Sequence, residues 1–353
     1  MRPNSLSYRP FSPFVVVGSS KSGTTWLQKI LDLHPQIRCH FHIPIFPLNR
    51  KELFYPASVV FKCGNSPYNG LFDQRQEEQY HATLNYINGI NVLEREFFES
   101  RTRGMTREGA HQTQRLHRRT VRSIVEALLC GETDKHIVGT KAYTDLDNLF
   151  DIFPDAKVIH IIRDGRDVCV SKRFHTLRKG IYYFGDEKNI VFRFINHWDL
   201  SLRVVKFLRR RFNWFGKNWF MQAGAESPLF TQTCLTKFAE DWRRVVTYIL
   251  KRNRQHPDQF LTVYYEQLKN DGHQQIKKIL TFLSARSDAK TVETLIEKTR
   301  FDRLKKENLN LNSFFRKGVI GDWKNHFKKD DIKLFDKIAG ELLVDLKYEK
   351  KRD

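Results

Sequence analysis

Residues 14–26 read FVVVGSSKSGTTW, and this stretch decides the fold. It begins with a run of β-branched residues, Phe14–Val17, that is typical of a buried parallel strand. A glycine-containing loop follows, and from Thr25 to Leu33 apolar residues recur at helical spacing until Pro35 ends the helix. At such a junction, backbone N–H groups and the helix dipole form a cradle for an anion.

The loop differs from the nucleotide-binding loop GxxxxGK[ST] at the decisive position. Thr24, and not a lysine, follows the second glycine, whereas the lysine lies inside the loop as Lys21. Lys21 can therefore reach past a first phosphate towards a group that leaves or attacks there. The hydroxyls of Thr24 and Thr25 stand at the start of the helix. This composition favours a single phosphate that carries a transferable group and is bound without a metal.

Strands and helices alternate again further along the chain, which predicts a parallel sheet. We expect strands at Ile37–Phe41, 136–138, Lys157–Ile162 and Phe260–Val263, and helices at 144–150, 164–175, 235–253, 274–283 and 332–346. The predicted fold class is α/β, a single P-loop-like domain whose central parallel sheet is flanked by helices. It covers residues 1–353, with helical insertions at about 43–130 and 176–235.

The chain is strongly basic, with 61 Lys and Arg against 40 Asp and Glu and a net charge of +21. Such a charge predicts an anionic partner, which could be nucleic acid, a membrane surface, a sulfated or phosphorylated sugar, or an anionic cofactor. Basic residues gather at 101–122 and 203–217. The first stretch is either a solvated helix face or a surface that gathers substrate.

Cysteine usage and hydropathy indicate the compartment. The 5 cysteines are scattered and form no CxxC pair, which argues against a disulfide framework or a zinc site and favours a reducing compartment. No apolar run reaches the length of a signal-peptide core or a membrane span. We therefore expect a cytoplasmic protein.

Two further segments carry phosphate chemistry. Residues 158–171 read VIHIIRDGRDVCVS, in which a buried strand delivers Arg163 at its carboxyl end and Ser171 follows on a helix. An arginine fork and a hydroxyl at that edge of a parallel sheet suit a phosphate. Residues 313–327 read SFFRKGVIGDWKNHF, in which two cations, Arg316 and Lys317, precede Gly318 in a loop that can close over a phosphate.

These segments resemble those of the sulfotransferases that use 3′-phosphoadenosine 5′-phosphosulfate (PAPS). KSGTTW resembles the 5′-phosphosulfate loop of that family, 158–171 its 3′-phosphate strand and helix, and RKGVIGDWKN its C-terminal signature. The resemblance implies in-line transfer of a sulfuryl group to a hydroxyl, less readily an amine, with release of adenosine 3′,5′-bisphosphate (PAP). It places at the cofactor Lys21, Ser22, Gly23, Thr24, Thr25, Trp26, Arg163, Ser171, Tyr265, Thr299, Phe301, Arg316, Lys317 and Gly318.

The adenine-side assignments rest on shorter motifs. Tyr265, followed by Glu266, resembles the Tyr-Glu motif that places a tyrosine near adenine in the family. Thr299 to Asp302 resembles an element whose aromatic ring, here Phe301, covers adenine, and Trp26 would stack on the opposite face. A position in the core is equally open for Phe301.

For catalysis, the resemblance implies that Lys21 stabilises charge on the bridging and leaving oxygens. Cytosolic members carry a Lys-Thr-His segment, but here Lys141 is followed by Ala142, and Thr140 stands where carbohydrate-type members have a glutamate. Protein-tyrosine sulfotransferases place a catalytic glutamate at the turn that here holds His42. We hypothesise that His42 takes the acceptor proton while Lys141 assists with the sulfuryl charge. The alternative is that His40 and His42 are ordinary strand-edge histidines.

Two other classes compete with this interpretation. A P-loop phosphotransferase, or kinase, would need a lysine at position 24 and a requirement for Mg²⁺. A basic nucleic-acid-binding protein would fit the charge, but the chain has no zinc spacing, helix-turn-helix or aromatic RNA-binding strand motif, so nucleic acid is not the expected partner.

The acceptor class stays open among sugars, lipid or polyketide alcohols and small phenols. The excess positive charge favours an acidic acceptor or peripheral contact with an anionic membrane. Nothing in the sequence indicates the oligomeric state.

Overall fold

The computed structural model describes residues 11–41, 107–130, 133–141, 146–178, 229–300, 303 and 318–350. Its centre is a 5-stranded sheet in the order β2-β3-β1-β4-β5, and every pair of neighbouring strands is parallel. The strands are β1 (Phe14–Val17), β2 (Ile37–Phe41), β3 (Ile137–Lys141), β4 (Lys157–Ile162) and β5 (Phe260–Tyr264). The predicted α/β fold with a parallel sheet is confirmed, and the carboxyl ends of all strands lie along one edge.

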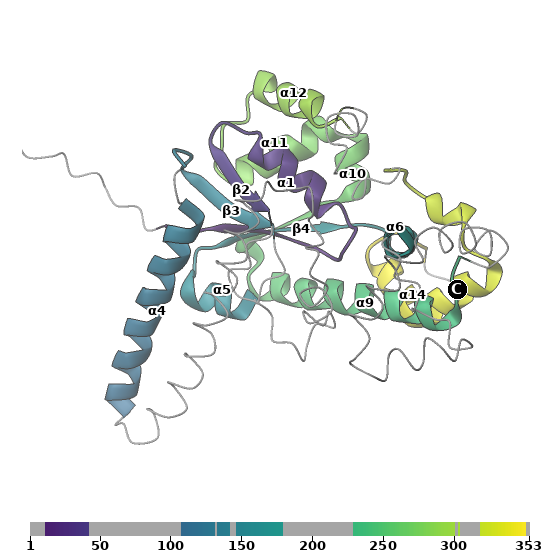
Figure 1. The fold of residues 1–353 in the computed structure, drawn as a ribbon, viewed down its shortest axis with the longest axis horizontal. Helices are drawn as coiled ribbons and strands as arrows, with labels where there is room; N and C mark the ends of the chain where they lie inside the picture. The colour runs from purple at the N-terminus through teal and green to yellow at the C-terminus, as the bar shows by residue number, and fades with distance from the viewer. Residues whose placement is uncertain are drawn as a thin grey trace, which may run out of the picture.

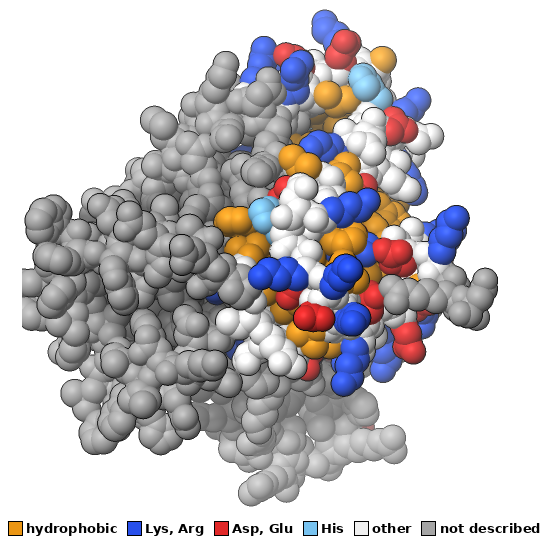
Figure 2. All heavy atoms as spheres, turned by 90° about the vertical axis from the view of Figure 1, so that its right-hand side faces the viewer, with side chains coloured by type: hydrophobic (Ala, Val, Ile, Leu, Met, Phe, Trp, Pro, Cys, Tyr) orange, Lys and Arg blue, Asp and Glu red, His pale blue; other side chains and the backbone are white. Residues whose placement is uncertain are grey.

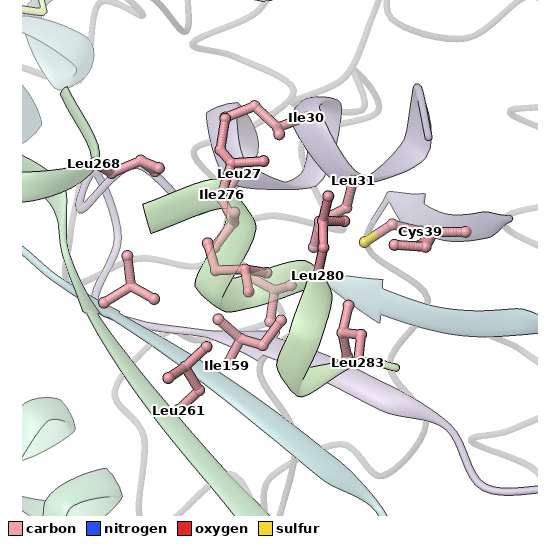
Figure 3. Close-up of a cluster of buried hydrophobic side chains, with 14 of the residues drawn as sticks. Leu27, Ile30, Leu31, Cys39, Ile159, Leu261, Leu268, Ile276, Leu280 and Leu283 are labelled. Atoms are coloured by element: carbon pink, nitrogen blue, oxygen red, sulfur yellow. The ribbon is translucent and has the colours of Figure 1, made fainter. Parts of the chain in front are cut away.

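Four helices cover one face of the sheet (Figure 1). They are α1 (Thr24–Asp32), α10 (Tyr265–Asn270), α11 (Gly272–Phe282) and α12 (Ala289–Lys298). Leu27 of α1 and Leu280 of α11 are fully buried in a cluster that also includes Ile159 of β4 (Figure 3). Burial of such a side chain contributes about 1.5–3 kcal/mol, so this cluster fixes α1 and the loop before it against the sheet.

The opposite face is covered by α4 (Arg107–Cys130), α5 (Leu146–Ile152) and α9 (Gln232–Gln255) (Figure 1). Strand residues alternate between the faces, so Val15 and Val158 pack here against Leu149 of α5. Next to this layer, α6 (Gly165–Arg178) and α14 (Lys329–Asp345) pack on α9 through Trp242 and Phe335. The short 3-10 helices η2 (Pro257–Gln259) and η4 (Asp322–Asn325) complete the described elements.

Most predicted elements lie where the sequence places them, with some shifts at their ends. The strand expected at 136–138 continues to Lys141, because it pairs on both sides, with β1 and β2. The helix expected at 144–150 is observed as α5, at Leu146–Ile152.

Of the two basic stretches, only the first lies largely within the described residues. The first, at 101–122, lies largely in α4, one end of which projects from the body (Figure 1). The second, at 203–217, falls outside the described residues. On the face shown in Figure 2, Lys and Arg side chains of the described part are spread between acidic ones rather than gathered in one patch.

Candidate active site

The loop between β1 and α1 is a tight turn at the carboxyl edge of the sheet. Lys21 and Gly23 both adopt left-handed conformations, with φ of 73° and 104°. The backbone N–H and the hydroxyl of Ser22 both donate to the carbonyl of Ser19, at 3.1 and 2.8 Å. Gly18 is required here, because a Cβ would lie 2.5 Å from the carbonyl oxygen of Ile161.

The turn leaves the start of α1 without a capping side chain. Gly23 is the N-cap residue, and it has no side chain that could accept from the first N–H groups of the helix. The Ser19 hydroxyl oxygen nearby in the loop is buried without a hydrogen-bond partner. The first N–H groups of α1, beside Lys21, are therefore without a side-chain cap, an arrangement that suits an anion; that an anion binds here stays a prediction from the sequence.

The expected adenine-side residues lie together next to this loop. Trp26 and Tyr265 meet edge to face with ring centroids 5.6 Å apart, and the Trp26 indole N–H donates to the carbonyl of Thr299 at 3.1 Å. A Cβ on Gly23 would lie 2.6 Å from the Tyr265 ring, so this ring packs directly on the loop. Phe301, the other aromatic residue expected here, lies outside the described residues.

Arg163 joins three segments that are far apart in the sequence. It follows β4, it is only 6 % exposed, and its guanidinium carbon lies 4.4 Å from the centre of the Tyr265 ring. One Nη donates to the carbonyl of Val319 at 2.9 Å, and the other is 3.5 Å from the carbonyl of Lys21. Arg163 Nε is buried without a partner. The phosphosulfate loop, the end of β4 and the C-terminal signature therefore meet at one guanidinium.

Asp167 holds the C-terminal signature against α6. Its carboxylate accepts from the backbone N–H groups of Gly321 and Trp323, at 2.8 and 2.9 Å, and lies 3.5 Å from Arg163 Nη2. Burial raises the pKa of Asp167, and the charge of Arg163 partly offsets that rise. In the sequence, Asp167 lies near the start of the helix expected at 164–175.

Gly318 is the one member of the Arg316–Gly318 set within the described residues, and it lies at the site. It has a φ of 63°, and its carbonyl accepts from the Tyr265 hydroxyl at 3.4 Å and from the Lys269 ammonium. Ser171 is buried on α6. The sequence interpretation did not include Lys269, and the only signal for it was its position one turn after Tyr265 on the same helix.

Lys141 ends β3, beside β1, and reaches the start of α1. Its Nζ lies 3.5 Å from the Thr25 hydroxyl oxygen and 4.1 Å from the centre of the Phe41 ring. Burial lowers the pKa of Lys141 to about 8. The structure therefore brings this expected catalytic lysine to the same helix end as Lys21.

The other expected catalytic residue, His42, lies outside the described residues. Its neighbour His40 lies within 2.7 Å of the carbonyl of Leu129, through Nε2, and burial lowers the pKa of His40. This contact joins β2, an edge strand, to α4 and supports a structural role for His40.

A family model described as "Sulfotransferase domain" matches residues 12–347, and the chain belongs to the sulfotransferase family. Similar curated proteins include mouse sulfotransferase 1B1, at 26% identity over 52% of this chain and 52% of that protein. Another is mouse sulfotransferase 2A2, at 33% identity over 54% of this chain and 57% of that protein. The chain spans about half the length of the curated relatives it matches.

Solved structures similar to the chain include mouse sulfotransferase SULT7A1 in complex with PAP, with 17% sequence identity and a TM-score of 0.45. The match covers 94% of this chain and 84% of that chain. A second is retinol dehydratase in complex with androsterone and PAP, with 19% identity, 99% and 84% covered, and a TM-score of 0.44.

Two further observations concern the described part of the chain. It contains no group of three or more His, Cys, Asp or Glu side chains placed to hold a metal ion. None of its helices combines the length and the apolar character that a membrane crossing needs.

Proposed function

We propose that this chain transfers the sulfuryl group of PAPS to a hydroxyl group of an acceptor and releases PAP. The observation that carries the proposal is the position of Arg163, whose side chain contacts Lys21, Asp167 and Val319. Membership of the sulfotransferase family supports the same reaction.

The described residues fit a ligand with phosphates at two ends. At one end are the uncapped start of α1 and Lys21, which suit the 5′-phosphosulfate. To the 3′-phosphate we assign Arg163, whose buried Nε lacks a partner, and Ser171, which is buried on α6. The pair of rings formed by Trp26 and Tyr265 lies beside the loop and suits adenine. Phe301, Arg316 and Lys317 stay predictions from the sequence.

The chain's own residues supply the electrostatics that the reaction needs. Negative charge develops on the leaving phosphate as the bond from its bridging oxygen to sulfur breaks, and preorganised donors stabilise such charge without reorganising. Lys21 is held in the turn by a strained left-handed backbone, which costs about 1–2 kcal/mol and fixes where its side chain starts. The N–H groups of Thr24 and Thr25, in the uncapped first turn of α1, lie beside this turn and suit the phosphate.

The acceptor class is the finer part of the proposal. A sugar, a lipid or polyketide alcohol and a small phenol remain candidates, and the net charge of +21 favours acidic members of each class. A peripheral contact with an anionic membrane, a cytoplasmic location and a single domain with two insertions remain expectations from the sequence.

The test is a transfer assay with the purified chain and ³⁵S-labelled PAPS over panels of phenols, sterols, lipid alcohols and sugars, each in neutral and acidic forms. We expect labelled product from at least one panel in the presence of EDTA, and saturable PAP binding by calorimetry. Phosphate transfer from MgATP without PAP binding would instead identify the kinase alternative. Salt-sensitive DNA binding without PAP binding would identify the nucleic-acid alternative.

A further inference from the structure

The surroundings of Lys141 differ from those of Arg163, the other described cation of the site whose contacts are given above. Its Nζ is next to the Thr25 hydroxyl and over the ring of Phe41. Among the described residues, the titratable group that acts on it is the Cys39 thiol of β2. Burial raises the pKa of Cys39 well above its usual value, so this thiol is neutral and offers no counter-charge.

The position of Lys141 follows from the sheet. β3 pairs with β1 in parallel, with Val16 opposite Lys141, so the strand ends directly beside the loop that holds Lys21. The Thr25 hydroxyl, at 3.5 Å, stands in the first turn of α1, where the sulfated phosphate is expected. Lys141 therefore reaches the helix end that faces the transferred group, from the side opposite to Arg163, since β3 and β4 flank β1 on its two sides.

We propose that Lys141, as a neutral amine, is the general base that takes the proton from the acceptor hydroxyl. This inference rests on the proposed sulfuryl transfer and assigns the proton to a described residue. The bond from the acceptor oxygen to sulfur forms, and the bond from sulfur to the bridging phosphate oxygen breaks with its electron pair left on PAP. The proton of the acceptor moves to the Lys141 amine, which becomes an ammonium and later returns the proton to solvent.

The chemistry of the pocket supports the neutral form. Lys141 is withdrawn from water, and among the described residues no carboxylate acts on it, so its charged form loses a proton more easily. Bound PAPS is an anion and opposes this effect, so the kinetic pKa of the ternary complex is expected at or above the value of about 8 in the free protein. Activity should then rise with pH through that range.

The first test does not depend on activity. Lysines are labelled with a trace of an amine-reactive acetylating reagent between pH 6 and 10, and each site is quantified by mass spectrometry. We expect half-maximal labelling of Lys141 near pH 8, and protection of Lys141 when PAP is added. Lys157 is the matched control: it is a lysine whose pKa burial also lowers, but it starts β4 at the amino edge of the sheet, so PAP should not protect it. Equal PAP effects at both sites would overturn the assignment.

The second test separates a base from a fixed positive charge. Lys141→Arg keeps the charge but cannot lose its proton, so we expect turnover to fall by at least about 100-fold while PAP affinity stays within a few-fold. The turnover of Lys141→Ala should fall by a similar factor. Added primary amines should restore part of this turnover, and at a fixed concentration of free amine the more basic amines should restore more. Lys157→Arg should keep wild-type turnover.

The opposite outcomes are equally clear. If Lys141→Arg keeps its activity while His42→Ala loses it, the base is His42 and Lys141 only supports the sulfuryl charge. If Lys141→Arg is inactive and Lys141→Ala is not rescued by any amine, the base assignment is overturned as well. A wild-type chain that binds no PAP and transfers no sulfate contradicts the proposed function itself, which the labelling and PAP measurements distinguish from failure of the base assignment.

Discussion

Two cationic regions lie at the carboxyl edge of the same sheet, and they are built in opposite ways. Around Arg163, the cation is matched by a carboxylate and by backbone carbonyls, and an aromatic ring packs on its face. Around Lys141, the described partners are a hydroxyl, a ring and a neutral thiol. β1 lies between the strands that carry the two regions, and the loop after β1 is next to both of them.

The difference indicates which region holds a side chain in a fixed direction and which region can change its charge. Arginine keeps its proton in proteins, and a fork tied to fixed carbonyls holds its direction, so we expect the Arg163 region to position a ligand. Burial lowers the pKa of Lys141 to about 8, and among the described residues no carboxylate opposes this, so we expect the Lys141 region to take part in proton transfer. Each prediction below would break or sharpen this division.

The largest effect is expected from Lys21→Ala. Loss of one preorganised donor to a developing negative charge costs about 10²–10³-fold in turnover, and we expect a loss of at least that size in the labelled-sulfate assay. Thermal unfolding is the control. Lysine and alanine both carry a Cβ and have a similar conformational cost at this left-handed position, so the melting temperature should hardly change. A near-wild-type rate would contradict the role of the loop.

The next effect concerns binding rather than rate. Arg163→Ala should weaken PAP binding by about 10- to 100-fold in calorimetry, the range for a lost charged hydrogen bond. Arg252→Ala, which removes an arginine from a surface pair with Asp147, should bind PAP like the wild type. If both variants bind equally, Arg163 does not position the ligand.

The loop itself can be tested through stability. Gly23→Ala combines a φ of 104° with a Cβ at 2.6 Å from the Tyr265 ring, whereas Gly321→Ala has a φ of 74° and nothing within 4 Å. We expect Gly321→Ala to lose about 1–2 kcal/mol of unfolding free energy from its conformation, and Gly23→Ala a further 1–3 kcal/mol from overpacking. Urea denaturation measures both, and equal losses would show that Tyr265 does not pack on the loop.

The smallest effect tests whether burial alone shifts a titration in this sheet. Both ring nitrogens of His160 on β4 are buried without partners, and burial lowers the pKa of His160 to about 3. The folded protein therefore favours the neutral ring. This stabilisation is complete above the ordinary pKa of about 6.5 and is lost as the pH falls from there towards 3.

The measurement is the unfolding free energy at pH 7.5 and 5.5 for the wild type and His160→Leu. A single such group contributes a slope of up to about 1.4 kcal/mol per pH unit below pH 6.5. We therefore expect the acid loss to be smaller in the variant. His34 and His40, whose pKa values burial also lowers, keep part of the slope in both proteins. Identical pH dependence would show that His160 is not buried as a neutral ring.

Much of the fold could be predicted, because the strands are short apolar runs and the apolar residues of the helices recur at helical spacing. The bounds predicted for β1, β2 and β4 are the observed ones. The end of β3 was placed too early: glycine is unfavourable inside a strand by propensity alone, yet Gly139 lies within this one. Gly139 is fixed by packing instead, since a Cβ there would lie 2.3 Å from the carbonyl of Phe14. Such contacts depend on a neighbouring strand that is remote in sequence.

The candidate site was predictable as a set of motifs but not as an arrangement. Lys21, Arg163 and Gly318 were each expected at the ligand, and in the structure the Arg163 guanidinium lies near the Lys21 carbonyl and over the ring of Tyr265, whose hydroxyl donates to Gly318. The hydrogen bonds from Gly321 and Trp323 to Asp167 could not be predicted, because they join α6 to residues 154 and 156 positions further along the chain. The pKa of Lys141 was also out of reach, since its burial depends on Phe41 from another strand.

The order of the strands has a consequence for how the chain is made. β1 is the third strand across the sheet but the first to be synthesised, and its partners begin near Gly139 and Lys157. Closing such long loops is entropically costly, so the sheet is expected to form late and slowly. Until then Phe14–Val17 is an apolar strand with both edges open, the kind of segment that associates with other chains. The strand that leads into the candidate anion site is thus an apolar segment with open edges until β3 and β4 have been synthesised.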